Sequence, residues 1–140
     1  MSAVILIADD EPNILVSLEY LMKREGYTVH LARDGQEALE LLRRERPRLV
    51  LLDVMMPRKT GFEVCQEIRQ DDAIRDTLVL MLTAKGRETD IVKGLALGAD
   101  AYMTKPFSTR ELVQNVQDRL AGGGRARDAA PAGGAPSGSV

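Results

Sequence analysis

Five short apolar runs alternate with segments of helical periodicity, and this alternation restricts the fold more than any other feature of the chain. The runs occupy residues 4–8 (VILIA), 27–32 (YTVHLA), 49–52 (LVLL), 78–82 (LVLML) and 101–104 (AYMT). Strands that alternate with helices are typical of βαβ units, whose strands run parallel. The sequence therefore predicts an α/β fold built around a five-stranded parallel sheet.

The segments between the runs carry apolar residues at the spacing of amphipathic helices. Pro12 suits the first turn of a helix and Gly26 its stop, so we expect a helix over about residues 12–25. Apolar positions within 38–42, 62–68 and 91–96 predict three further helices. The last helix has the clearest start, because Ser108 followed three residues later by Glu111 is the signature of a capping box.

The 140 residues are about the length of one domain, but the composition changes at Gly122. Residues 122–140 hold six of the twelve glycines and no aromatic residue. Such a segment buries too little apolar surface to order itself. We expect residues 1–121 to form one domain and residues 122–140 to be a disordered tail or linker rich in Gly, Ala and Pro.

Charge and composition exclude several classes of protein. The formal net charge is -2, so no overall basic field attracts nucleic acid or anionic lipid. The single cysteine, Cys65, excludes an internal disulfide framework, and the sequence contains no signal peptide and no long apolar span. We expect a cytoplasmic protein without direct nucleic-acid or membrane partners.

Polar residues stand directly behind four of the five runs. Asp9 and Asp10 follow the first run, Asp53 the third, Thr83 the fourth and Lys105 the fifth. In an open parallel sheet, the carboxyl ends of the strands border the crevice in which ligands bind. We therefore expect all five side chains to converge there.

The chemistry of these residues points to a metal-assisted phosphoryl transfer. Three carboxylates raise one another's pKa, so a bound cation is implied, and oxygen ligands with room for water favour Mg²⁺ over a caged Ca²⁺. A metal beside a carboxylate, an ammonium and a hydroxyl suits phosphoryl transfer, with Asp53 as the candidate phosphoacceptor. Each residue alone has an ordinary explanation: Asp9 and Asp10 could cap a helix, Thr83 could end a strand and Lys105 could be solvated. Their convergence favours a site.

The same residues belong to four short motifs, namely Asp9-Asp10, Asp53-Val54-Met55-Met56-Pro57 followed by Gly61, Thr83-Ala84, and Lys105-Pro106-Phe107. In order and spacing, this set resembles the motifs of response-regulator receiver domains of bacterial two-component signalling, over about residues 3–120. The resemblance implies a doubly wound, flavodoxin-like sheet of strand order 2-1-3-4-5 with helices on both faces. It also implies a regulatory domain that catalyses only its own phosphorylation and dephosphorylation.

The resemblance further implies a role for each site residue. Asp53 would accept a phosphoryl group from a phosphohistidine on a sensor histidine kinase or phosphotransfer protein. Asp10, Asp53 and the backbone carbonyl of Met55 would hold Mg²⁺, and Asp9 would act through a water molecule. Lys105 would pair with the phosphoryl oxygens.

A conformational switch is implied in the same way. Thr83 would move its hydroxyl toward the phosphoryl oxygens, and Tyr102 would turn into the vacated space. This would reshape the face of the fourth helix, fifth strand and fifth helix, which a downstream protein would bind. The small side chain of Ala84 either admits the partner's phosphohistidine or serves packing alone, and the bond between Lys105 and Pro106 is expected to be cis.

Departures from related patterns narrow the function. Receivers of winged-helix transcription factors usually pair through an acid and an arginine at places where Ala101 and Asn115 stand here, so we do not expect that dimer. A phosphohydrolase of the haloacid-dehalogenase group has a second acidic residue two positions after its nucleophile, where this chain has Met55. A flavin-binding domain of the same topology has a loop rich in Ser, Thr or Gly after its first strand, where this chain has the acidic residues 9–11. The chain would act alone, as the receiver half of a larger regulator, or as a phosphate-independent scaffold.

Overall fold

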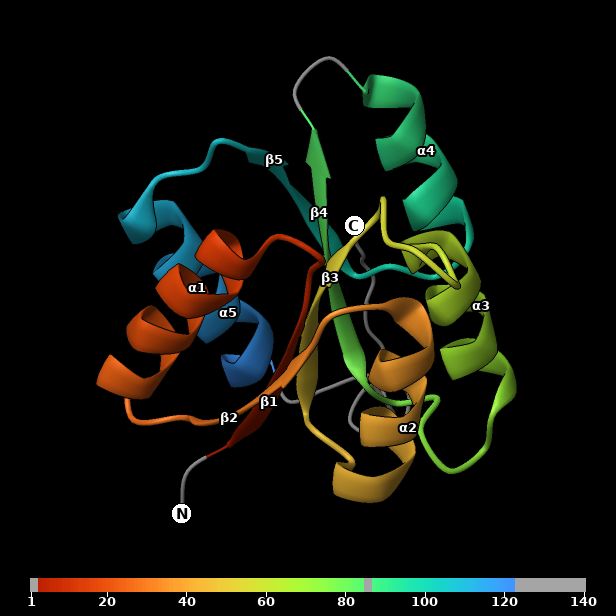
Figure 1. Ribbon diagram of the computed structural model, residues 1–140, viewed down its shortest axis with the longest axis horizontal. Coiled ribbons are helices and arrows are strands. Elements are labelled where there is room, and N and C mark those ends of the chain that lie inside the picture. The colour runs from red at the N-terminus through yellow and green to blue at the C-terminus, as the bar shows by residue number, and fades with distance from the viewer. Residues whose placement is uncertain (1–2, 85–86, 123–140) are drawn as a thin grey trace.

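The computed structural model describes residues 3–84 and 87–122, which alternate between strand and helix along the chain (Figure 1). The elements are β1 (Val4–Ala8), α1 (Pro12–Arg24), β2 (Thr28–Ala32), α2 (Gly35–Glu45), β3 (Leu49–Asp53), α3 (Gly61–Gln70), β4 (Leu78–Ala84), α4 (Glu88–Ala96), β5 (Ala101–Lys105) and α5 (Thr109–Ala121). Each apolar run forms a strand and each predicted helix is present. All but the first residue of the predicted tail lies outside the described residues.

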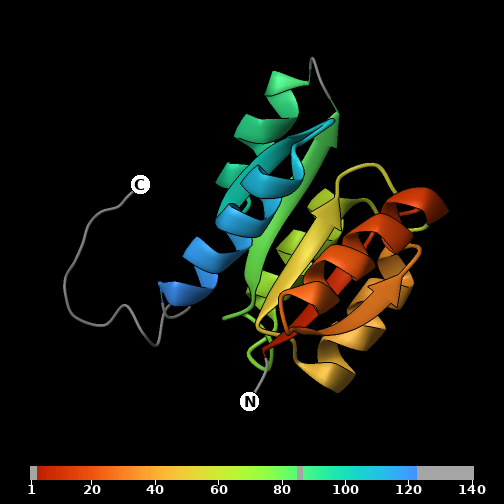
Figure 2. The same cartoon turned by 90° about the vertical axis from the view of Figure 1, so that its left-hand side faces the viewer.

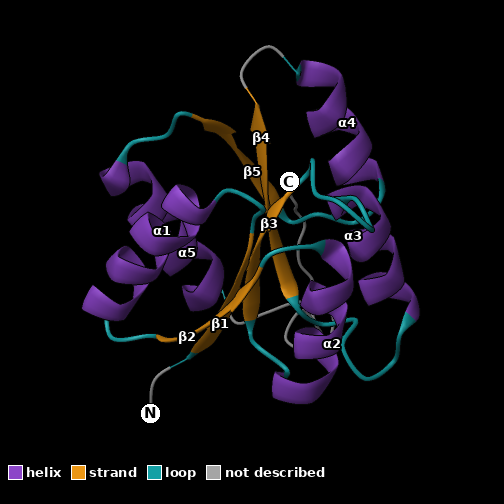
Figure 3. Cartoon of the chain, viewed as in Figure 1, coloured by secondary structure: helices purple, strands orange, loops and turns teal. Residues whose placement is uncertain are grey.

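The strands form one sheet in the order β2-β1-β3-β4-β5, and every neighbouring pair is parallel. α1 and α5 cover one face, while α2, α3 and α4 cover the other (Figure 3). Figure 2 shows α1 and α5 lying in front of the strands. The predicted strand order, parallel pairing and two helical layers are therefore confirmed. Among the residues described, no helix is both long and apolar enough to cross a bilayer.

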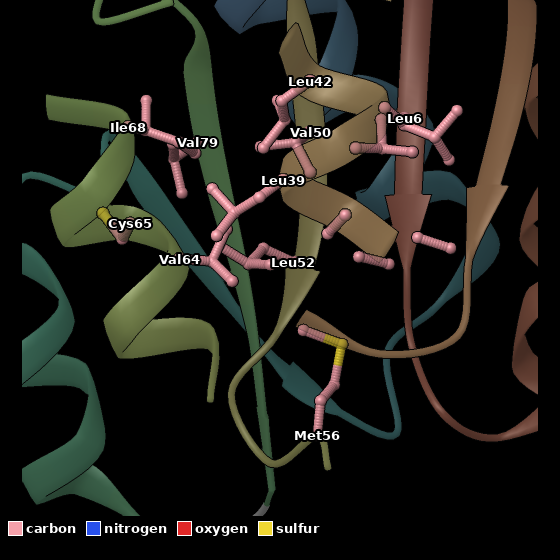
Figure 4. Packing of buried hydrophobic residues seen from close by; sticks show 14 of the residues in the cluster. Leu6, Leu39, Leu42, Val50, Leu52, Met56, Val64, Cys65, Ile68 and Val79 are labelled. Atoms are coloured by element: carbon pink, nitrogen blue, oxygen red, sulfur yellow. The ribbon is translucent and has the colours of Figure 1, made fainter. Parts of the chain in front are cut away.

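The central strands are apolar at successive positions because both faces of the sheet are buried. Leu49 and Leu51 of β3 belong to the cluster beneath α1 and α5, whereas Val50 and Leu52 belong to the cluster beneath α2 and α3. Figure 4 shows the second cluster gathered around β3. Side chains alternate between the faces of a strand, so a strand covered on both sides has no apolar-polar alternation. This explains the four consecutive aliphatic residues before Asp53.

Two of the helices begin with a Ser or Thr side-chain cap of the predicted kind. The Ser108 hydroxyl accepts a hydrogen bond from the Glu111 amide at 3.0 Å, which forms the first half of the expected capping box at α5. A complete reciprocal box begins α3: the Thr60 hydroxyl accepts from the Glu63 amide at 3.2 Å, and the Glu63 carboxylate accepts from the Thr60 amide at 2.9 Å. This second box was not predicted, although its spacing carries the same signature.

The cap at α3 gives a stability prediction. Thr60→Ala removes the hydroxyl that satisfies a free amide in the first helical turn, so we expect the free energy of unfolding to fall by about 1 kcal/mol. Urea denaturation measures this change. Thr89→Ala, at an exposed position in the first turn of α4, is the matched control and should have little effect. Equal losses in both variants would mean that the Thr60 cap does not stabilise the protein.

Candidate functional site

Charged side chains from the ends of β1, β3 and β5 meet at the carboxyl edge of the sheet. The Lys105 ammonium lies 2.9 Å from Asp9 Oδ2 and 3.3 Å from Asp53 Oδ1. Carboxylate oxygens of Asp9, Asp10 and Asp53 all lie within 4.8 Å of one another. The structure thus brings together four of the five residues that were expected to converge.

The register of the sheet explains how Lys105 reaches the acids. Lys105 pairs with Ala84, and Asp53 pairs with Leu82, so the end of β4 separates the lysine from Asp53. Paired residues of neighbouring strands point to the same face, and the Ala84 methyl group leaves room for the lysine chain to cross the strand end. The bond between Lys105 and Pro106 is cis, as the resemblance predicted.

The loop after β3 folds back tightly on Asp53. The Gly61 amide donates a hydrogen bond to the Val54 carbonyl at 2.8 Å, and the Val54 amide donates to the Leu82 carbonyl at 3.1 Å. A Cβ at Gly61 would overlap the Asp53 carbonyl oxygen and stand 2.9 Å from Val54 Cα. Glycine is required at position 61 because no side chain fits between the loop and β3.

The Asp53 carboxyl is buried among unequal charges. Its side chain is only 7% exposed. Burial and the charge of Asp9 raise the pKa of Asp53 from 3.8 to about 7, although Lys105 acts in the opposite direction. Burial alone would lower the pKa of Lys105, but its hydrogen bond to Asp9 and the charge of Asp53 raise that pKa. One ammonium therefore leaves the pocket with an excess of negative charge.

The three acids differ in how far they are already engaged. Asp9 is fully buried; one of its oxygens accepts from Lys105, and the other accepts from the Glu11 amide at 2.9 Å. Asp10 is exposed, and Asp53 keeps one oxygen outside its contact with Lys105. All these donors are oxygens, which suit a hard divalent cation such as Mg²⁺. The free ligand oxygens belong mainly to Asp10 and Asp53.

Glu11 belongs to the site although it was not predicted. Its Oε1 lies 3.4 Å from the Lys105 ammonium, and its side chain is 61% exposed. Lys105 is therefore shared by three carboxylates. The acidic run that directly follows β1 was the available signal, because Glu11 extends it by one residue.

Thr83 and Tyr102 lie on one face of the sheet, apart from the ion pairs. Within the part of the chain that the structure describes, the Thr83 hydroxyl has a long 3.4 Å hydrogen bond to the Ala84 carbonyl and none to Asp53. Tyr102 pairs with Met81, two positions before Thr83 on β4, so both predicted switch residues point to the face covered by α4. Tyr102 is 43% exposed.

A separate groove of about 760 Å³ lies between β5 and α5. Tyr102 forms part of its wall on β5, and Asn115 and Arg119 form part of its wall on α5. The side-chain oxygen of Asn115 and the Nε atom of Arg119 are buried, and neither has a hydrogen-bond partner among the described residues. The groove therefore adjoins the predicted switch residue on the face that was expected to bind a partner.

The raised pKa of Asp53 predicts how stability depends on pH in metal-free solution. The folded protein holds the Asp53 proton with a pKa of about 7 and the unfolded chain with a pKa of 3.8. The folded state binds more protons between these values, so the free energy of unfolding should fall as pH rises through the interval. Asp53→Asn should remove this fall. Above about pH 7, its free energy of unfolding should exceed that of wild type by on the order of a few kcal/mol.

Urea unfolding with a chelator at several pH values measures this difference. Asp72→Asn is the matched control, because the Asp72 side chain is 94% exposed and lies outside the cluster. It should follow the wild-type pH dependence. Identical pH dependence of the free energy of unfolding in wild type and Asp53→Asn would refute the raised pKa of Asp53.

Comparison with known proteins agrees with this geometry. The family model of the response regulator receiver domain matches residues 5–117. A putative response regulator from Chloroflexus aurantiacus is 34% identical, with a TM-score of 0.83 over 86% of this chain and 99% of its own. The signal receiver domain of a signal transduction histidine kinase from Syntrophus aciditrophicus is 32% identical, with a TM-score of 0.82 over 89% of this chain and 95% of its own.

A third similar structure is the chemotaxis protein CheY4 of Vibrio cholerae, which is 32% identical, with a TM-score of 0.79 over 84% of this chain and 98% of its own. The family model's match, residues 5–117, extends from β1 into α5 and includes the acidic edge of the sheet. The chain therefore belongs to the family of response regulator receiver domains of two-component signalling.

Proposed function

We propose that this chain is a phosphorylation-switched signalling domain that accepts a phosphoryl group on Asp53 in the cytoplasm. The donor would be a phosphohistidine of a sensor histidine kinase or phosphotransfer protein, and the reaction would require Mg²⁺. The observation that carries this proposal is the buried Asp53 carboxylate, held beside Asp9, Asp10 and a single ammonium from Lys105. Such a pocket offers a nucleophile and attracts a cation.

The cation would be held by the acids that keep free oxygens. Asp10 and Asp53 would be direct ligands together with the backbone carbonyl of Met55, and Asp9 would act through water because both of its oxygens have partners. When bound, Mg²⁺ supplies positive charge that neutralises the phosphoryl oxygens and lowers the pKa of Asp53.

Asp53 and Lys105 would share the work of the transfer. An Asp53 oxygen attacks the phosphorus, the new O–P bond forms as the P–N bond to the donor imidazole breaks, and the imidazole leaves with the bonding electrons. The Lys105 ammonium already lies 3.3 Å from Asp53 Oδ1, so it needs little movement to pair with a phosphoryl oxygen. Ala84, exposed at the end of β4, leaves the approach to Asp53 open for the donor protein.

Phosphorylation would then shift the balance between two packings of the α4 face. The phosphoryl group adds close to two negative charges and new acceptor oxygens. Thr83 is free to respond, because its hydroxyl has only a long hydrogen bond at 3.4 Å. Tyr102 would follow from its half-exposed position on the same face, and the groove between β5 and α5 would change shape for a downstream protein.

The first test is chemical. After incubation with acetyl phosphate and Mg²⁺, we expect the intact mass of the protein to increase by one phosphoryl group. Asp53→Asn should give no adduct because the nucleophile is lost, and chelation of Mg²⁺ should lower the yield at least about tenfold. Mass spectrometry of the intact chain measures all three.

Asp72→Asn is the matched control and should be phosphorylated like wild type, since its side chain is 94% exposed. An adduct that persists in Asp53→Asn would overturn the assignment of the phosphoacceptor. No adduct on folded wild-type protein would instead favour a scaffold that acts without phosphate.

The second test concerns the switch. Tyr102→Ala should reach the same adduct yield as wild type, because β4 lies between the strand of Tyr102 and the strand of Asp53. The phosphorylation-dependent changes in the amide NMR signals of α5 should fall to less than about half, since the side chain that reshapes the groove is gone. Tyr20→Ala is the control and should retain these changes, because the Tyr20 side chain is 63% exposed on α1. Unchanged α5 responses in Tyr102→Ala would refute the switch role.

A further inference from the structure

Arg69, near the end of α3, holds two loops at the edge of the sheet opposite Asp53, namely the loop between α3 and β4 and the turn between α4 and β5. Its Nε and Nη2 groups donate to the Gly98 carbonyl at 3.0 and 2.8 Å, and Nη2 also donates to Asp100 Oδ2 at 2.9 Å. Its Nη1 group donates to the carbonyls of Arg75 and Thr77 at 2.8 and 2.7 Å. We call Arg69, Gly98 and Asp100 the Arg69 clamp.

The clamp holds the turn between α4 and β5 in a conformation that glycine permits. Gly98 has a φ of 112°, and a Cβ there would stand 2.8 Å from Arg69 Cγ. Asp100 Oδ2 also accepts from the Val79 amide at 2.8 Å, and the Asp100 amide donates to the Val79 carbonyl at 2.8 Å. The carboxyl end of α4 is therefore fixed to both α3 and the start of β4.

The rest of α4 is held far less firmly. Its buried residues are Asp90 and Gly94, whereas α2 buries four aliphatic side chains besides its first glycine. Val92 and Leu95 of α4 are 69% and 44% exposed. A helix that buries little apolar surface has little free energy holding it in one position. In Figure 1, α4 begins near the carboxyl end of β4 and runs back beside α3.

The contact of α4 with the sheet lies next to the predicted switch. Gly94 approaches the Met81 side chain, and a Cβ there would lie 3.5 Å from Met81 Cγ. Met81 pairs with Tyr102 and lies two residues before Thr83 on the same face. A displacement of Thr83 or Tyr102 would therefore reach α4 through Met81.

We propose that the Arg69 clamp is the pivot of the conformational switch. Arg69 is a positioning residue: it fixes the carboxyl end of α4 and the start of β5, so that phosphorylation tilts the amino-terminal part of α4 and does not displace the whole helix. The inference rests on the proposed phosphorylation of Asp53. It assigns a role in signal transmission to a residue at the opposite edge of the sheet from the phosphoacceptor.

Hydrogen exchange of the full chain, with and without acetyl phosphate and Mg²⁺, tests the pivot. In wild type, phosphorylation should change the exchange rates of amides in residues 88–94 at least about threefold and leave those of residues 97–100 unchanged. Arg69→Met removes every donor of the clamp. Without phosphate, this variant should already exchange at least about tenfold faster at residues 97–100, and phosphorylation should no longer act selectively on residues 88–94.

Arg75→Met is the matched control, because the Arg75 side chain is 59% exposed and its ion pair with Asp72 lies outside the clamp. It should behave as wild type. Arg69→Lys keeps a positive charge near Asp100 but cannot bridge the same acceptors, so its exchange rates should resemble those of Arg69→Met. It replaces Arg69→Met in the test if that variant does not fold.

Intact mass separates the two hypotheses, because adduct yield reports the proposed function and exchange reports the pivot. A normal adduct with wild-type selectivity in both Arg69 variants would overturn the pivot alone. Equal effects of phosphorylation on residues 88–94 and 97–100 of wild type would also overturn it. The absence of any adduct on wild type would overturn the proposed function and this inference with it.

Discussion

One ammonium group among three carboxylates, two of them buried, joins the strand ends that make up the site. Lys105 lies within 3.4 Å of oxygens from Asp9, Glu11 and Asp53, which come from the ends of β1 and β3. These contacts link residues as many as 96 positions apart in the chain. They require that β1, β3 and β5 end at the same edge of the sheet and lie close together, which the parallel pairing and the order of the strands provide. The topology of the sheet is thus a precondition of the charge cluster.

The same ammonium leaves the pocket under-neutralised, and this excess negative charge connects stability with function. Burial and Asp9 outweigh Lys105 at Asp53, whose pKa rises to about 7. A pocket optimised for stability would pair each acid or omit it. The apolar clusters on both faces of the sheet provide the stability that the pocket lacks. They allow the site to remain attractive to a cation before any ligand binds.

The strands, the helices and the acidic edge could be predicted from local patterns. Runs such as LVLL indicate strands that are buried on both faces, and the polar residues that follow such runs indicate the strand ends. The order of the strands could be predicted only from the resemblance to a family, because periodicity does not show which strands are neighbours in the sheet. Glu11 and the Thr60 cap were not predicted, although each has a local signal in the sequence: the acidic run after β1, and the spacing of Thr60 and Glu63. The Arg69 clamp had none, because its partners at Gly98 and Asp100 lie about thirty residues away and depend on how α3 packs beside the turn.

The elements of the fold differ in how firmly they are packed, and this difference determines which of them can move when the site changes. β3 is buried at every position, so Asp53 cannot move far when its charge changes. α4 has a fixed carboxyl end and a weakly packed remainder, and it touches the sheet beside Met81. A change at the carboxyl edge therefore costs the least free energy when it moves the loosely packed part of α4 and the half-exposed Tyr102. In physical terms, the rigid sheet confines the response to the face that is free to change.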